Sequence, residues 1–249
     1  MKTFPIFLRI FLFGYFLAVQ QLLSAGPPYF TDDPDPVQYQ HWEFYISSQS
    51  VFNQRTNYAT GTLPHFEVNY GVIPNVQLHT ELPVNYNYSS PHYMTFGYSN
   101  TEFGIKYRFV KENQNCPEIG IFPIVEIPTL NNTEFGNGSV QIYLPIWIQK
   151  SWGKFTTYGG GGYWINPGVD NINWFYAGWQ AQYDFSKVIT LGTEIYYHSK
   201  DAKDSRHASG ITIGGSLNFT EKCHFIFSVG HSILNDNYTT SYVGLLWTI

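Results

Sequence analysis

The chain has few charged residues and few cysteines for its length. Only 12% of its 249 residues are charged, and a formal net charge of −5 argues against nucleic acid as a partner. The two cysteines, Cys116 and Cys223, fall in predicted turns on one side of a membrane but far apart around the predicted barrel, which favours two free thiols over a disulfide. Aromatic residues make up 19%, so we expect one sizeable domain with much apolar surface.

Long apolar runs are also missing, apart from one at residues 1–25. This run begins with Lys2 and Arg9 and ends in small residues, a pattern typical of a secretory signal peptide cleaved after Ala25. A retained helical anchor is the alternative, but charged and polar residues interrupt the run. Cleavage removes both basic residues, so the exported chain would carry a net charge of −7.

Residues 26–40 are rich in proline and aspartate and show no periodicity. They can form neither a central strand nor a helix, so we predict a solvated leader on the periplasmic side, ahead of a barrel at 41–249. The segment contains three aspartates that suggest a calcium-binding site, Asp32, Asp33 and Asp35. The segment lacks the glycine and the distal glutamate of a calcium loop, however, so a solvated leader is the better interpretation.

Residues 173–199 show the repeating unit of the chain most plainly. In the first arm the apolar Phe175 and Trp179 fall on one face and Gln180 on the other; Ile195 and Glu194 divide in the same way in the second arm. Each arm has about ten residues, which at ~3.3 Å per residue and a tilt span a hydrocarbon core of roughly 30 Å. Strands of a soluble sandwich would be nearer five or six residues. The pattern therefore predicts a transmembrane hairpin.

Twelve segments with this alternation follow one another from residue 41. Connections after the even segments are mostly short and those after the odd ones tend to be longer and polar, as in bacterial outer-membrane barrels with short periplasmic turns. We therefore predict an all-β, antiparallel, up-and-down transmembrane β-barrel with both ends in the periplasm. The predicted strands cover residues 41–52, 64–73, 76–88, 99–110, 118–128, 139–150, 154–165, 173–184, 188–199, 209–219, 224–234 and 240–249.

The last segment resembles the terminal strand by which the barrel assembly machinery recognises outer-membrane barrels. That signal usually closes on an aromatic residue, so Ile249 departs from it and Trp247 takes the aromatic role. This resemblance implies two partners, the assembly machinery and the lipid of the outer membrane.

A second resemblance is carried by GPPYFTDDPDPVQYQHWEFYISSQ, from Gly26 to Gln49. This stretch is similar to the start of a transporter-like family named for a meta-pathway of phenol degradation. Beyond it the likeness is only the general barrel pattern. The resemblance implies an outer-membrane barrel that passes small organic molecules, aromatic ones among them, and it carries over no binding residues.

Charged and imidazole side chains fall on the polar phase of their strands, which we assign to the lumen. A charge facing lipid at mid-membrane would cost about 2–4 kcal/mol. These groups form either a lining that selects permeants or ion pairs that plug a closed barrel, and Tyr45, Tyr196 and Trp164 narrow the interior further. The predicted lining comprises Glu43, Glu67, His79, Glu81, Glu102, Lys106, Arg108, Glu126, Glu194 and His198, with His65 on the same phase.

Three neighbouring strands carry residues that weaken a β-ladder near mid-membrane. They suggest a lateral opening through which an apolar solute leaves the lumen into lipid; ordinary curvature and bulging are the alternative. The residues are Pro123, Pro145, Gly159, Gly160, Gly161 and Gly162.

The chain offers weak signals for catalysis or metal binding. His207 and Ser209 match the His-x-Ser arrangement of lipid-hydrolysing barrels, but Glu221 is about 14 residues away at ~3.3 Å each, too far to orient the histidine. No pair of histidines has close ligand spacing with a carboxylate or cysteine on one face. We therefore predict no catalytic residue, no metal and no cofactor.

The sequence as a whole predicts a porin-like channel or transporter in the outer membrane of a Gram-negative bacterium, not an enzyme. Its permeants would be small aromatic or apolar organic molecules that pass by diffusion. A closed structural or adhesive barrel is the alternative, because long aromatic-rich outside loops such as residues 86–98 suit binding. A lipid hydrolase is a third and weaker alternative.

Overall fold

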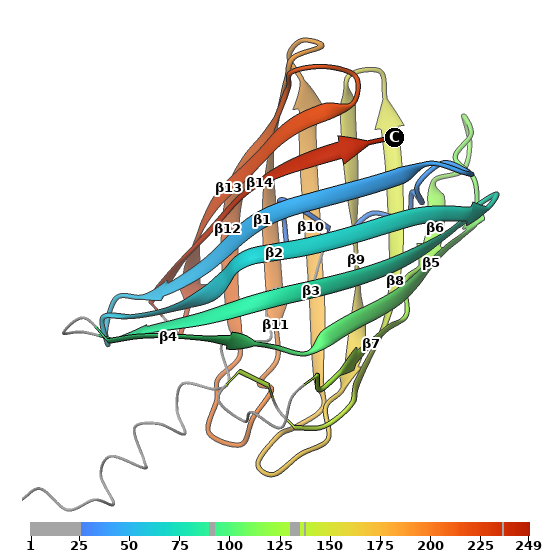
Figure 1. Ribbon diagram of the computed structural model, residues 1–249. Helices are drawn as coiled ribbons and strands as arrows, with labels where there is room; N and C mark the ends of the chain where they lie inside the picture. Colours follow the sequence, from blue (N-terminus) through green and yellow to red (C-terminus); the bar gives the residue numbers. More distant parts are fainter. Residues whose placement is uncertain (1–25, 90–92, 130–134, 137, 236) are drawn as a thin grey trace, which may run out of the picture.

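The computed structural model of the chain forms one closed antiparallel β-barrel (Figure 1). The first strand pairs with the last, so the sheet has no free seam between the two ends of the chain. No helix in the described residues is long and apolar enough to cross a membrane. The predicted signal peptide lies outside those residues, and its cleavage stays a prediction. The described residues are 26–89, 93–129, 135–136, 138–235 and 237–249.

Fourteen strand segments make up twelve barrel strands, which confirms the predicted fold. β4 and β5 both pair with β3, and β6 and β7 both lie between β5 and β8, so each of these two pairs is one interrupted barrel strand. The segments are β1 (Trp42–Asn53), β2 (Tyr58–Ile73), β3 (Val76–Ser89), β4 (Tyr93–Tyr98), β5 (Thr101–Val110), β6 (Glu118–Ile121), β7 (Ile124–Ile127), β8 (Gln141–Trp152), β9 (Phe155–Ile165), β10 (Trp174–Asp184), β11 (Ile189–His198), β12 (Ala208–Asn218), β13 (Cys223–Leu234) and β14 (Tyr238–Thr248).

The expected loop at residues 86–98 is a hairpin instead. β3 continues to Ser89 and β4 pairs with it, so that Tyr86 lies opposite Phe96 with ring centroids 6.2 Å apart. Cross-strand aromatic pairs of this kind stabilise a ladder, which explains why the strands run on. The prediction of a long outside loop here is therefore wrong for the residues described.

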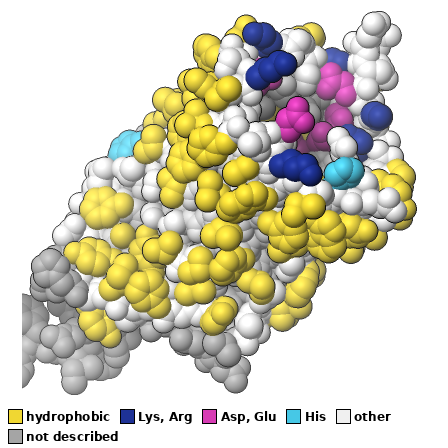
Figure 2. All heavy atoms as spheres, turned by 45° about the horizontal axis from the view of Figure 1, so that its top comes forward, with side chains coloured by type: hydrophobic (Ala, Val, Ile, Leu, Met, Phe, Trp, Pro, Cys, Tyr) yellow, Lys and Arg dark blue, Asp and Glu magenta, His cyan; other side chains and the backbone are white. Residues whose placement is uncertain are grey.

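Period-two alternation divides the side chains between the two sides of the wall. Phe175 and Trp179 are 44% and 49% exposed on the outside, whereas Gln180 and Glu194 are completely or almost completely buried on the inside. Figure 2 shows apolar side chains spread over the outer wall, and charged ones gathered around a hollow at one end. The outer surface is apolar where a soluble protein would carry charge.

The interior has two unlike walls. The aromatic wall consists of buried rings on β8 to β11, in which Trp164 stacks between Tyr143 at 4.7 Å and Trp174 at 5.4 Å. The charged wall lies across β2, β3 and β5 and consists of Glu67, His79, Glu81, Glu102 and Lys106, all buried. The lumen is thus packed by rings on one side and lined by ionisable groups on the other.

The glycine run on β9 lies in an intact part of the wall. β9 pairs without a register shift with β8 on one side and with β10 on the other. A Cβ on Gly159 would lie 2.4 Å from the ring of Trp179, and one on Gly162 would lie 2.5 Å from Tyr143, so the glycines make room for rings of neighbouring strands. A lateral opening through this place stays a prediction.

The two prolines do not break the wall either. Pro123 lies between β6 and β7, yet both segments keep the same register with β8. The carbonyl of Pro123 still accepts a hydrogen bond from Ile105 N at 3.1 Å, and Pro145 lies opposite Gly162. Each of these prolines therefore removes one backbone N–H donor from the ladder and leaves the register of the strands unchanged.

Gly160→Ala should destabilise the barrel. Gly160 has a φ of +154°, and a Cβ there would lie 2.1 Å from the carbonyl oxygen of Ile146, so backbone must shift. We expect a loss of about 1–3 kcal/mol, measured as a lower temperature of the heat-modifiable shift on gels. Gly153→Asn is the control, because Gly153 also has a positive φ but has open space around it, and asparagine tolerates that conformation. Equal stability of the two variants would contradict this account.

Candidate channel lumen

The leader lies inside the barrel. Tyr29, Thr31, Asp32 and Val37 are all buried, and the segment contacts strands on opposite sides of the lumen (Figure 1). The prediction of a solvated periplasmic leader is therefore wrong about its surroundings. The physical reason is that its acidic groups, backbone amides and carbonyls find charged and polar partners on the inner wall.

One side of the leader is held next to the aromatic wall. The backbone N–H of Thr31 donates to Glu194 Oε1 at 2.5 Å, and the Thr31 hydroxyl lies 3.1 Å from the hydroxyl of Tyr176. Ser228 Oγ donates to the carbonyl oxygen of Pro28 at 2.5 Å. Phe30 meets the ring of Tyr196 edge-on at 4.8 Å. Glu194, which we predicted as a lining residue, thus binds the leader directly.

The other side is held by ion pairs with the charged wall. Lys106 Nζ lies 3.0 Å from Asp32 Oδ1 and 3.6 Å from Asp33 Oδ1. Arg108 pairs with Asp35 of the leader. Burial raises the pKa of Asp32 and of Asp35 above the ordinary value, and the basic partners oppose that shift. The leader therefore supplies the counter-charges of the two basic lining residues.

The wall comes unusually close to the leader at Gly178 on β10. A Cβ at this position would lie 2.0 Å from Thr31 Oγ1, which is closer than real Cβ contacts. Only glycine leaves room here for the leader. The close approach means that β10 and the leader fit each other in this docked state.

A cavity of about 310 Å³ remains between the leader and the charged wall. It is lined by six of the predicted lining residues and by Asp32, Asp33 and Asp35 of the leader. The six are Glu43, Glu67, His79, Glu81, Glu102 and Lys106.

The other four predicted residues do not line this cavity. Arg108 contacts Glu118 at 3.3 Å as well as the leader, and Glu194 holds Thr31. Glu126 accepts hydrogen bonds from the side chains of Asn100 and Gln141. His198 is buried beside Trp174, with its ring edge-on at 6.2 Å.

Sequence reasoning missed several polar residues that matter here. Asn69 and Gln77 line the cavity, and Gln77 Oε1 accepts a hydrogen bond from Val37 N of the leader at 2.9 Å. The period-two pattern of the sequence does indicate them, since Asn69 and Gln77 fall on the inward face of their strands together with Glu67 and His79. The leader itself gave no such signal, because it has no periodicity.

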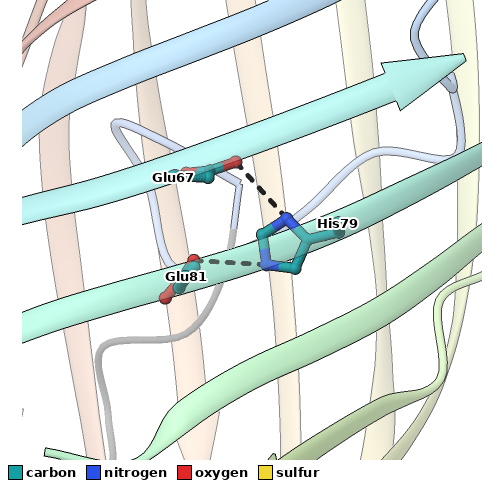
Figure 3. A group of neighbouring side chains, drawn as sticks. All are labelled: Glu67, His79 and Glu81. Atoms are coloured by element: carbon teal, nitrogen blue, oxygen red, sulfur yellow. Dashed lines mark ion pairs between the residues drawn. The ribbon is translucent and has the colours of Figure 1, made fainter.

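The expectation that no histidines lie at ligand spacing from a carboxylate on one face is also wrong. Cross-strand pairing places Glu67 beside Glu81, and His79 lies between them, 3.6 Å and 3.5 Å from their oxygens (Figure 3). Potential ligand atoms of these three residues lie within 4.8 Å of one another. Spacing along β3 places His79 and Glu81 on one face, but it does not reveal Glu67, which comes from β2.

The His-x-Ser pattern does not form a catalytic pair in the structure. His207 is exposed and Ser209 is 9% exposed, and no hydrogen bond joins them among the described residues. Glu221 lies in the turn beyond the other end of β12. Cys116 is exposed and Cys223 is partly buried, and both thiols are free.

Comparison with known proteins shows similarity in structure but not in sequence. No protein-family model and no curated protein matches the chain. An outer membrane channel from Pseudomonas putida F1 is similar with a TM-score of 0.68 and 12% identity, over 87% of this chain and 98% of that one. The shared feature is the fold.

Two porins show the same likeness. The KdgM porin has a TM-score of 0.55 and 13% identity over 82% of this chain and 98% of its own. The NanC porin has a TM-score of 0.55 and 10% identity over 81% of this chain and 98% of its own. At such identities these similarities support the barrel architecture, and the resemblance to the phenol-degradation family stays a prediction.

Lys106→Met should loosen the leader. Asp32 would keep its buried charge without a cation, and breaking a buried ion pair in this way costs about 3–5 kcal/mol. Val37→Cys, in a chain with Cys116 and Cys223 replaced by serine, reports the leader's exposure through its rate of reaction with a thiol reagent. We expect labelling to be at least about tenfold faster in the Lys106→Met background.

The control for this experiment is Lys150→Met. Lys150 pairs with Glu112 at 3.2 Å and contacts no leader residue among those described. Labelling should then proceed as in the parent. An unchanged rate with Lys106→Met would show that the ion pair does not hold the leader.

Proposed function

We propose that the chain is an outer-membrane channel for passive diffusion of small solutes, and that its leader closes or narrows the lumen until it is displaced. The observation that carries this proposal is the leader docked in the lumen through separate polar contacts, beside a charged cavity, in a barrel whose wall is complete without it. Neighbouring solved structures described as an outer membrane channel and as porins support it.

The membrane placement rests on the outer surface. Apolar side chains such as Ile146, Ile195 and Ile213 are each more than half exposed on the outer wall, where lipid would cover them. The strand segments other than β4, β6 and β7 have ten to sixteen residues, which suits a tilted crossing of the hydrocarbon core. In this proposal the chain is exported by a cleaved signal peptide, and β14, which closes the barrel, is the strand that the assembly machinery recognises.

Aromatic or apolar organic molecules are the proposed permeants. Once the leader is displaced, the stacked rings of the aromatic wall would offer flat apolar surface, and the opposite wall would offer ionisable groups for polar substituents. This combination, with the resemblance of the leader to a phenol-degradation family, favours small aromatic solutes over sugars.

Gly178→Val should open the channel. The added side chain occupies the place of Thr31 Oγ1, so the leader cannot dock on β10. We expect a severalfold larger single-channel conductance in planar bilayers than for the parent, and faster swelling of proteoliposomes in phenol than in arabinose. Ala177→Val is the matched control, because it adds two methyl groups to the neighbouring residue on the opposite phase of the same strand.

A closed structural or adhesive barrel is the second candidate, and the filled aromatic side of the lumen favours it. A variant that lacks residues 26–38 distinguishes the channel from the closed barrel. If this variant folds, as shown by heat-modifiable migration, and neither it nor Gly178→Val conducts, the channel proposal is wrong. Equal conductance of the Gly178 and Ala177 variants would instead remove the leader from the mechanism.

A further inference from the structure

Four carboxylates lie side by side around the inner wall. Cross-strand pairing places Glu67 opposite Glu81, Glu81 opposite Glu102, and Glu102 opposite Glu126, so the row crosses four neighbouring barrel strands. Directly opposite residues have Cβ atoms about 4.5–5.5 Å apart, and like charges in such pairs repel each other. The first three of these carboxylates are no more than 7% exposed. A buried row of this kind requires cations or protons.

Among the described residues, two histidines supply positive charge next to the row. His65 contacts Glu81 at 2.9 Å, and His79 contacts Glu102 at 3.0 Å, so two imidazolium ions would leave at least two negative charges in the row. Lys106 is already paired with Asp32 and Asp33 of the leader.

Hydrogen-bond donors are also few around Glu126, the last carboxylate of the row. Glu126 is held by the amide groups of Asn100 and Gln141, which are 7% and 1% exposed. The side-chain carbonyl oxygens of these two residues are buried, and among the described residues they have no hydrogen-bond partner. Buried acceptors without donors next to unbalanced carboxylates point to a bound cation.

The ring of His79 is oriented as metal-ligating histidines are. Asn69 Nδ2 donates to Glu67 Oε1 at 2.7 Å, which turns the Asn69 carbonyl oxygen toward His79 Nδ1, also at 2.7 Å. Nδ1 must therefore carry a proton, and in the neutral ring the lone pair is on Nε2. That nitrogen faces Glu81 Oε1 at 3.5 Å and Glu102 Oε1 at 3.0 Å. A hydrogen bond to the other ring nitrogen is the usual second shell of a histidine ligand.

We infer that this cluster is a binding site for a divalent transition metal of the zinc type. The proposed ligands are His79 Nε2 and carboxylate oxygens of Glu81 and Glu102. Glu67 lies on the other side of the His79 ring from Glu81 (Figure 3). Ligand atoms at about 2.0–2.1 Å from a tetrahedral zinc lie about 3.3 Å from each other, close to the two spacings around Nε2. The mixture of imidazole nitrogen and carboxylate oxygen suits zinc better than calcium, which takes six to eight oxygens.

The adjoining cavity gives an ion access to the site. Glu67, His79, Glu81 and Glu102 all line the cavity of about 310 Å³ below the leader. Phe122 meets the His79 ring edge-on at 5.1 Å and limits its rotation. A bound ion would join β3 and β5 and balance part of the charge of the row of carboxylates. This inference does not depend on whether the barrel conducts.

The test is metal binding by the refolded full-length mature barrel. Co²⁺ should give a visible d–d absorption band that Zn²⁺ abolishes, and calorimetry should show one Zn²⁺ per chain. His79→Gln and Glu81→Gln should remove both signals. Asn69→Ala should weaken Zn²⁺ binding by about 10- to 100-fold, because it removes the group that orients His79 and leaves the three ligands in place.

His198→Gln is the matched control. His198 is another buried histidine of the lumen, 6% exposed, and no carboxylate contacts its ring among the described residues. This variant should bind Zn²⁺ as the parent does. Circular dichroism and heat-modifiable migration establish that each variant is folded. If His79→Gln does not fold, the Zn²⁺ affinity of Asn69→Ala tests whether His79 is a ligand.

Three results would overturn the inference. The folded parent could fail to bind Zn²⁺ and Co²⁺, which would mean that protons alone balance the row. Binding could persist in His79→Gln or be undiminished in Asn69→Ala, which would place the metal elsewhere. A site that takes Ca²⁺ and leaves Zn²⁺ unbound would show that the imidazole is not a ligand.

Discussion

The closed hydrogen-bond ladder is the constraint on which the rest of this structure depends. β1 pairs with β14, and Trp42 and Ile249 exchange two backbone hydrogen bonds of 2.8 and 2.9 Å at the join. Apart from β4, which pairs only with β3 among the described residues, a sheet closed in this way leaves no edge whose donors and acceptors would need water. Its backbone therefore tolerates an apolar surrounding, and each side chain has only two places to go, outside or inside. Pro123 and Pro145 each remove a single backbone donor and keep the register of the strands around them.

The division of side chains between the two sides of the wall places the ionisable residues in the interior, where their charges need partners. Once the outside is apolar, the ionisable residues are forced into a narrow lumen, where an unpaired charge is costly. The leader meets part of this need, since its aspartates pair with Lys106 and Arg108, and its backbone N–H at Thr31 donates to one oxygen of Glu194. The aromatic residues fill the opposite side by stacking. The row of glutamates on β2, β3, β5 and β7 places four carboxylates side by side, and His65 and His79 are its imidazole partners in the part of the chain that the structure describes.

What could be predicted from the sequence is what depends on local pattern. The face of Trp179 or Glu194 follows from its place in a period-two strand, and tertiary packing does not change it. The contact between His79 and Glu67 depends on the register of two strands, which the turn at residues 74–75 and the bulges decide. The docking of Thr31 depends on a close approach at Gly178, and neither residue shows this alone. The hairpin beyond Tyr86 was missed because asparagine and serine there resemble a loop.

The way the leader is attached determines what kind of closure it can provide. It is joined to β1 almost without a linker, and Gln40 N donates to Gly71 O at 2.7 Å, so its end is fixed at the wall. Residues 26–37 are held by single contacts to different strands. Because rebinding of a tethered segment is intramolecular, such contacts suffice without a continuous ladder. In the proposed channel, release therefore means a swing about this fixed end that breaks a few buried polar pairs. The wall itself need not change, because its ladder is complete without the leader.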